Sequence, residues 1–176
     1  MRLAPYLAKL VYNSLLHTSY TTKKHGKLPC FWNQSKNRCF SLLQPENTFA
    51  SAGYNLQVIG QHDGVNSQGL VLGLHFVSNN DYTKGLSAWT SIRMILDTCS
   101  ILEDAIHMLQ EIPHSPCYNF SIGDGRGNIA VVEASPEKVM ARRGESLLSC
   151  VNHFQIKDLE TKNRTSIIPF DSPHHL

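Results

Sequence analysis

The spacing of the apolar residues changes twice along the chain, and this order limits the folds it can adopt. Residues 70–77 (LVLGLHFV) are an almost continuous apolar run, which predicts a strand buried on both faces. The next segment has helical spacing, with one apolar face made by Trp89, Ile92, Ile95 and Leu96. Strand-like segments then return. Strands, two helices and further strands predict an α+β domain, with helices covering an antiparallel sheet.

A second helix is predicted over residues 100–112, just before Pro113. Ser100 followed by Glu103 has the spacing of a capping box, in which each side chain bonds the backbone of the other. Its apolar stripe consists of Ile101, Ala105, Met108, Leu109 and Ile112.

Turn residues separate the predicted strands. Asp63-Gly64 and Gly69 predict a tight hairpin, and Gly73 inside a strand predicts the close approach of another backbone. The segment GDGRGN (123–128) predicts a hairpin turn, because it lacks the GKS or GKT ending of a phosphate loop and a strand follows it. The strands are predicted at 56–60, 70–77, 118–124, 128–134, 138–143 and 146–151.

Composition excludes several classes of protein. The 176 residues suit one domain, and five cysteines without a CxxC pair indicate neither a zinc ribbon nor a disulfide framework. We therefore expect a cytoplasmic protein. The nine histidines lack metal-ligand spacing, so no metal and no cofactor are expected. The absence of a GxSxG motif excludes a serine hydrolase of the α/β type. Glu133 is either a rim residue or a buried partner of an arginine.

The first 45 residues carry seven Lys or Arg and no acidic residue. Such a head suits an anionic surface or a targeting segment, but a loosely attached surface segment is the preferred interpretation. Its apolar stretch is too short and interrupted to span a bilayer. No alternation of aromatic and basic residues indicates nucleic-acid binding. The sequence gives no oligomeric state.

Four segments in order resemble one known family: GQHDGVNSQGLVLGLHFV, IRMILDTCSILEDAIHMLQEIPH, YNFSIGDGRGNIAVVEASP and SCVNHF. They are similar to the acyl-coenzyme A:6-aminopenicillanic-acid acyltransferase family of peptidases, which is related to choloylglycine hydrolases and other linear amide C–N hydrolases. The resemblance implies the N-terminal-nucleophile (Ntn) hydrolase fold, an αββα sandwich, incomplete here at both ends. It suggests a basic head over 1–36, the Ntn-like domain over 37–155 and a polar tail over 156–176.

The resemblance also suggests roles for three residues. On its own, Asn152 at the end of a predicted strand is either a turn residue or an amide donor to an oxyanion. The resemblance favours the oxyanion role for Asn152 and implies that Asn66 helps to hold the scissile amide. Both asparagines are then expected to face one cleft. The nucleophile of the family is an N-terminal cysteine whose α-amine acts as the base, and Cys30 is a weak candidate for it.

The sequence also departs from the family. No Cys-Thr start and no Arg-Asn-Tyr-Asp segment is present, and Cys30 is followed by Phe31. The expected function is that of a truncated and inactive relative of amide hydrolases or acyltransferases, with a small amide or acyl compound as its ligand. The alternative is a non-catalytic binding remnant or the product of a disrupted reading frame.

Limited proteolysis tests the interpretation of the head. Because the head has no carboxylate to pair with its basic residues, we expect cleavage before Cys39 while residues 50–154 stay intact. The fragments are identified by mass spectrometry, and a head that resists cleavage as long as the body would contradict this expectation.

Overall fold

The computed structural model describes residues 30–33, 38–56, 60–78 and 82–163. The predictions for most of the basic head, for the end of the polar tail and for the middle of the strand at 56–60 lie outside these residues. None of the described helices is long and apolar enough to cross a membrane.

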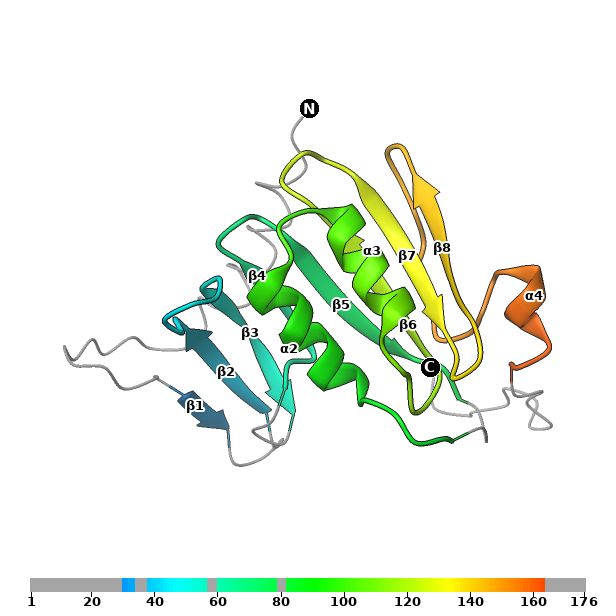
Figure 1. Cartoon of the computed structure of the whole chain (residues 1–176), viewed down its shortest axis with the longest axis horizontal. Helices are drawn as coiled ribbons and strands as arrows, with labels where there is room; N and C mark the ends of the chain where they lie inside the picture. Colours follow the sequence, from blue (N-terminus) through cyan, green and yellow to red (C-terminus); the bar gives the residue numbers. More distant parts are fainter. Residues whose placement is uncertain (1–29, 34–37, 57–59, 79–81, 164–176) are drawn as a thin grey trace, which may run out of the picture.

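The described strands form one antiparallel sheet in which spatial order follows chain order from β1 to β8 (Figure 1). This order confirms the predicted antiparallel sheet. Two helices interrupt it between β5 and β6. The strands are β1 (Cys30–Asn33), β2 (Arg38–Leu43), β3 (Ser51–Leu56), β4 (Asp63–Asn66), β5 (Val71–Phe76), β6 (Tyr118–Gly123), β7 (Ile129–Ala134) and β8 (Val139–Gly144).

The helices α2 (Ala88–Thr98) and α3 (Leu102–Glu111) lie side by side across one face of the sheet (Figure 1). Both helices were predicted from their apolar spacing. The main core lies beneath them and includes Leu72, Ile92, Ile95, Leu109, Phe120 and Val132. Burial of Ile106, which the predicted stripe omitted, shows that the apolar face of α3 is wider than expected.

The N-terminus of α3 differs from the predicted capping box. Its N-cap is Ile101, whose side chain cannot form a capping hydrogen bond. Glu103, expected to bond the backbone of Ser100, instead pairs with Arg143 of β8. The backbone N–H of Leu102 donates to Asp124 Oδ2 at 3.2 Å. The cap therefore comes from the turn between β6 and β7, because an orphan N–H at a helix start can donate to any well-placed oxygen.

Two strand predictions need correction. The strand at 70–77 was expected to be buried on both faces, but β5 alternates between buried and partly exposed residues. The close neighbour of Gly73 is a side chain rather than a backbone, because a Cβ there would lie 2.8 Å from Ser121 Oγ. The predicted strand at 146–151 is wrong, since residues 147–151 have no regular structure.

The turn assignments are partly right. Asp63 and Gly64 belong to β4, so the hairpin turn falls later, at residues 67–69, where Gly69 has a φ of 83°. The turn at 123–128 is confirmed: it joins β6 to β7, and Gly127 has a φ of 91°. A positive φ favours glycine at both positions.

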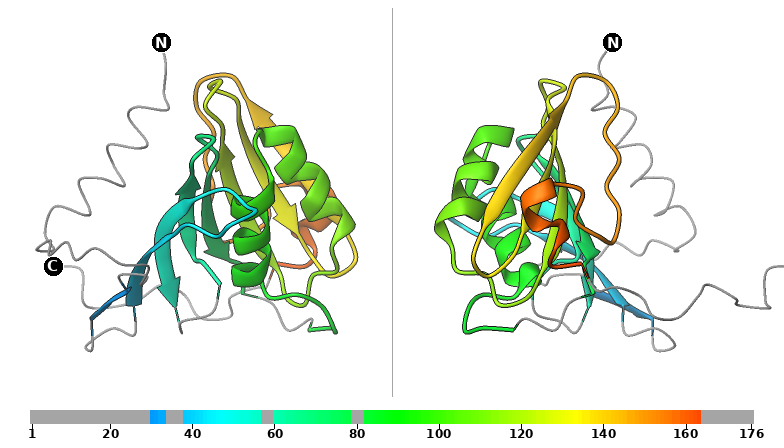
Figure 2. Two further views of the ribbon diagram at one scale, coloured as in Figure 1. Left: turned by 60° about the vertical axis from the view of Figure 1, so that its left-hand side comes forward. Right: turned by 90° about the vertical axis from the view of Figure 1, so that its right-hand side faces the viewer.

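The face of the sheet opposite α2 and α3, here called the far face, is partly covered by residues 145–163 (Figure 2). This segment ends in the short helix α4 (Lys157–Glu160). Phe154 and Leu159 are buried there with Val77 and Cys117 in a second apolar cluster. The packed unit thus continues beyond residue 155, where the sequence suggested that the domain ends.

The layers match the predicted sandwich only in part. An α+β fold with helices on an antiparallel sheet is present, but the described residues form a single sheet rather than two. A loop segment with one short helix occupies part of the far face, where an αββα sandwich has its second sheet (Figure 2).

Asp124 joins the turn after β6 to the start of α3, and this predicts an acid-sensitive stability. Although burial opposes its charge, hydrogen bonds from Asn128, Leu102 and Arg126 keep the pKa of Asp124 below its usual value. Its contribution is therefore complete above the unfolded-state pKa and is lost as the pH falls through the lower, folded-state value. We expect Asp124→Asn to reduce the free energy of unfolding at pH 7 by about 1–2 kcal/mol.

Urea unfolding at pH 7 and at pH 3 measures this difference, which should shrink at the lower pH. The control is Asp158→Asn, because the exposed pair of Asp158 with Lys138 contributes about 0–1 kcal/mol. A loss in Asp124→Asn no larger than that of the control would contradict the prediction.

Candidate functional site

Polar side chains gather on the far face in two neighbouring rows that run across the sheet. Strand register aligns the first row through Asp63, Gly73, Ser121, Val131 and Arg142. Register partners on neighbouring strands lie side by side on one face of the sheet. The second row lies two residues along each strand from the first, so both rows are on the same face. The second row contains His75, Asn119, Glu133 and Met140.

His75 and Ser121 form the central pair of this arrangement. His75 Nε2 lies 3.3 Å from Ser121 Oγ, and Ser121 Oγ also lies 3.3 Å from the carbonyl oxygen of Gly73, to which it donates. Gly73 on β5 is the register partner of Ser121 on β6, and it leaves room for the hydroxyl group because it has no Cβ. An imidazole next to a hydroxyl is an arrangement that can transfer a proton.

The charge of His75 is set by its surroundings. Burial, together with the nearby charge of His62, lowers the pKa of His75 below its usual value. The ring is therefore neutral near pH 7 and can accept a proton. Neighbouring residues in a strand point to opposite faces, but His62 precedes β4, and its Nδ1 lies 3.7 Å from Asp63 Oδ2.

Two buried side chains hold the segment that crosses the far face. Asn119 Nδ2 donates to the carbonyl oxygens of Val151 at 2.8 Å and His153 at 2.9 Å. Glu133 Oε2 accepts the backbone N–H groups of Gln155 and Ile156, at 2.9 and 3.0 Å. The segment is thus tied to two adjacent strands.

Glu133 is fully buried and is also paired with a cation. Its Oε1 lies 2.8 Å from Arg142 Nε. Arg142 Nη2 also donates a hydrogen bond to the carbonyl oxygen of Ser149, at 3.1 Å. Of the two sequence-based interpretations of Glu133, the buried partner of an arginine is confirmed. Removing one member of such a pair leaves an uncompensated charge in the interior.

A cavity of about 250 Å³ lies on the far face between the sheet and the segment. Its floor is aliphatic and Ser121 provides a hydroxyl group at its wall. The side chains around it include Val71, Ser121, Ile129, Val131 and Leu148. A small apolar space with a few polar groups at its edge is typical of a ligand site.

The described thiols are poorly suited to nucleophilic attack. Burial raises the pKa of Cys150 to about 11, so about one molecule in ten thousand carries the thiolate at pH 7. Burial likewise raises the pKa of Cys99. Cys117 is completely buried, so a substrate has no access to it.

Asn66, predicted to contact a substrate amide, has a structural role. Its Nδ2 donates to the carbonyl oxygens of Leu96 and Cys99 at the end of α2, at 3.0 and 2.8 Å. Its Oδ1 accepts the N–H groups of Gln68 and Leu70, both at 3.1 Å. The side-chain amide thus makes four hydrogen bonds, its full ordinary capacity.

The predicted common cleft of Asn66 and Asn152 is wrong. Asn66 points to α2, whereas Asn119 and Glu133 hold the segment of Asn152 on the far face, so the sheet lies between them. Asn152 itself is exposed in a bend, not at the end of a core strand. Cys30 belongs to β1 by its backbone, which pairs with β2, and its side chain lies outside the described part of the chain.

Sequence reasoning missed His75, Ser121 and Asn119. A signal was present, because each is a polar residue inside an otherwise apolar strand segment, at positions that alternate with core residues such as Leu74 and Phe120. The assumption that β5 is buried on both faces concealed it.

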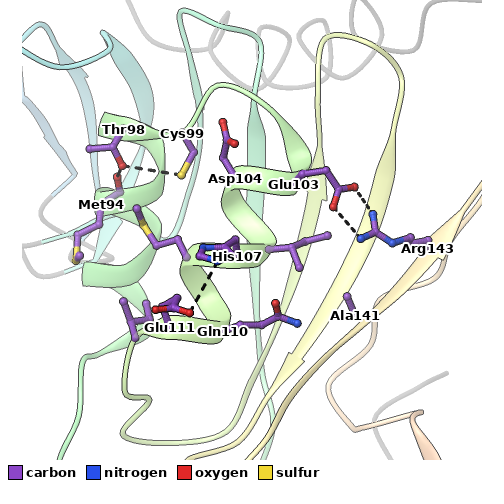
Figure 3. Close-up of a pocket in the computed structure, with 13 residues that line it drawn as sticks. Met94, Thr98, Cys99, Glu103, Asp104, His107, Gln110, Glu111, Ala141 and Arg143 are labelled. Atoms are coloured by element: carbon purple, nitrogen blue, oxygen red, sulfur yellow. Dashed lines mark hydrogen bonds and ion pairs between the residues drawn. The ribbon is translucent and has the colours of Figure 1, made fainter.

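A second, larger cavity of about 1020 Å³ lies over the outer side of α3 (Figure 3). Its side chains pair among themselves: Arg143 with Glu103, and His107 with Glu111 at 3.9 Å. Cys99 at its edge has a raised pKa. It therefore offers no activated nucleophile among its described side chains, although aliphatic side chains such as Ile106, Ile112 and Ala141 also line it. Within the described ranges, no three His, Cys, Asp or Glu side chains come together as metal ligands.

The family model for acyl-coenzyme A:6-aminopenicillanic acid acyl-transferase matches residues 32–172. This match covers most of the chain, so the chain belongs to that family. A search of curated protein sequences found no match.

Solved structures with a similar fold include two hydrolases. Penicillin V acylase from Agrobacterium tumefaciens is 22% identical, with a TM-score of 0.51 over 67% of this chain and 40% of that one. A variant of conjugated bile acid hydrolase from Clostridium perfringens is 17% identical, with a TM-score of 0.50 over 61% of this chain and 43% of that one. This chain thus spans less than half the length of either structure. It is related to the linear amide C–N hydrolases, with part of the Ntn hydrolase fold.

The Glu133 carboxylate should be needed for the far-face segment to stay in place. We expect Glu133→Gln to reduce the free energy of unfolding by about 3–5 kcal/mol, because Arg142 then lacks its partner charge. The pair of Glu103 with Arg143 is exposed and provides the control, so Glu103→Gln should cost much less than Glu133→Gln. Urea unfolding measures both values. Equal losses in the two variants would contradict the prediction.

Proposed function

We infer that this chain binds the acyl part of a small linear amide in the far-face cavity, and that its described thiols do not hydrolyse the amide. The observation that carries this inference is the aliphatic cavity with Ser121 at its wall, and with His75 Nε2 3.3 Å from the Ser121 hydroxyl oxygen. The hydroxyl group can donate to an amide carbonyl oxygen while the acyl chain contacts Val131 and Ile129. Membership of a family of amide-processing proteins supports the choice of ligand.

The size of the cavity selects among acyl groups. At about 250 Å³ it is smaller than the range of roughly 300–1,000 Å³ typical of sites for drug-sized ligands. A short aliphatic acyl chain therefore fits better than a steroid acid. We expect N-acylglycines with short chains to bind, and affinity to rise with chain length until the cavity is full.

The thiols support binding without turnover. Attack on an amide needs a thiolate next to a base. Cys150 is mostly protonated at neutral pH, and Cys117 has no exposed surface. The exposed position of Asn152 suits a donor to a bound ligand, so its predicted role at the carbonyl oxygen is retained as part of this proposal.

Two neighbouring leucines allow a matched test of the cavity. Leu148 lines it, whereas Leu147 is 88% exposed and does not. Titration of N-butyrylglycine, followed by ligand-observed NMR, should show binding to the unmodified protein. Leu148→Trp should weaken it at least about tenfold by filling the space, and Leu147→Trp should leave it unchanged. Equal affinities of the two variants would contradict the proposed site.

The same samples test the absence of hydrolysis. Release of glycine from N-butyrylglycine is followed with an amine-reactive fluorophore, and we expect none above a protein-free control. Release that disappears on Cys150→Ala, or on substitution of another cysteine, would overturn this part of the proposal.

A further inference from the structure

The Ser121–His75 pair has the features of a nucleophile with its base, on a chain whose family uses a thiol. The two reacting atoms are 3.3 Å apart, and Ser121 also lines the aliphatic cavity. Both side chains are partly exposed, so a small molecule can reach them. Neither residue was singled out by the sequence.

We propose that Ser121, with His75 as its base, takes up a short acyl group from an activated ester and holds it as an acyl-serine. This rests on the proposed function in one respect only, since the acyl chain would occupy the same cavity. It adds a covalent step and a different chemical class of donor, an ester with a good leaving group.

The step balances as an acyl transfer between two oxygens. His75 Nε2 takes the proton of Ser121 Oγ as this oxygen attacks the ester carbonyl carbon. This requires the other ring proton to be on Nδ1, and the hydroxyl group to turn toward His75 from the Gly73 carbonyl oxygen to which it otherwise donates. The bond from the carbonyl carbon to the leaving oxygen then breaks. With an aryl ester, the leaving group departs as a phenolate, or takes the proton from the imidazolium and departs as the phenol. The product is an ester of Ser121.

The surroundings favour this step with an ester over an amide. The lowered pKa of His75 keeps its ring neutral and able to accept the proton. Strand pairing on both sides of β6 engages the backbone around Ser121, so the N–H groups next to this residue are not free to bind an oxyanion. Only a good leaving group such as a nitrophenolate departs readily without that help. For the same reason the acyl-serine should be hydrolysed slowly and accumulate.

Gly73 sets the position of the nucleophile. It is the register partner of Ser121, and a Cβ at this position would lie 2.8 Å from the hydroxyl oxygen. Gly73→Ala should therefore displace the hydroxyl group from His75 while leaving the serine present. This makes it a test of geometry that is separate from removal of the nucleophile.

The experiment uses the full chain with its accessible thiols blocked by iodoacetamide, mixed with 4-nitrophenyl butyrate at pH 7. We expect a burst of about one equivalent of nitrophenolate, with the butyryl group located on Ser121 by peptide mass spectrometry. Ser121→Ala should abolish the burst, and His75→Gln and Gly73→Ala should slow it at least about tenfold. The control is Ser67→Ala, because Ser67 is exposed outside the cavity and should not matter.

The outcomes separate this inference from the proposed function. A burst that persists in Ser121→Ala, or acylation spread over lysines, overturns the inference. Circular dichroism and urea unfolding establish that each variant is folded. Binding of N-butyrylglycine without acylation of Ser121 would overturn the inference and leave the proposed function intact. Acylation of Ser121 without binding of N-butyrylglycine would overturn the proposed function and leave this inference intact. If neither binding nor acylation is seen, both the proposed function and this inference are overturned.

Discussion

The far face of the sheet depends on one buried carboxylate. Glu133 accepts hydrogen bonds from Arg142 and from two backbone N–H groups of the segment that follows β8. A buried charge is tolerated only when it is paired and hydrogen-bonded, so each of these contacts depends on the others. With Asn119, it fixes a segment without strand structure against the sheet. The cavity exists because this segment, which includes Leu148, stands over the aliphatic part of the same face.

The two faces of the sheet have different tasks. The face under α2 and α3 carries the main apolar core and has the packing expected of a stable domain. The far face combines polar rows with a small aliphatic space, and its polar residues come from several strands. Asn119 is instructive, because its Oδ1 is buried without a hydrogen-bond partner among the described residues. Leaving such an atom unpaired costs about 1–3 kcal/mol of folding free energy. The two hydrogen bonds that its Nδ2 donates to the far-face segment offset this cost.

Most of the architecture could be predicted from local patterns. Helical spacing located α2 and α3, and Gly127 marked the turn between β6 and β7. The failures have physical causes. The capping box at Ser100 was a local pattern, but Arg143 from a distant strand took Glu103 and Asp124 supplied the cap. The segment 146–151 is apolar like a strand and was therefore predicted to be one. It does not pair with a strand, and side chains of Arg142 and Asn119 bond its backbone instead.

The sequence by itself determined the family, the placing of two helices between strands, and most of the apolar face that each helix buries. The family follows from the resemblance of four sequence segments, whereas the helices and their apolar faces follow from residue spacing, which is a property of neighbouring positions along the chain. Only the tertiary structure decided which polar residues meet. Asn66 was drawn to the end of α2, and His75 was placed beside Ser121, 46 residues later, because strand register aligned β5 with β6. A register shift of one residue would move every one of these side chains to the opposite face, so no local pattern could specify the site.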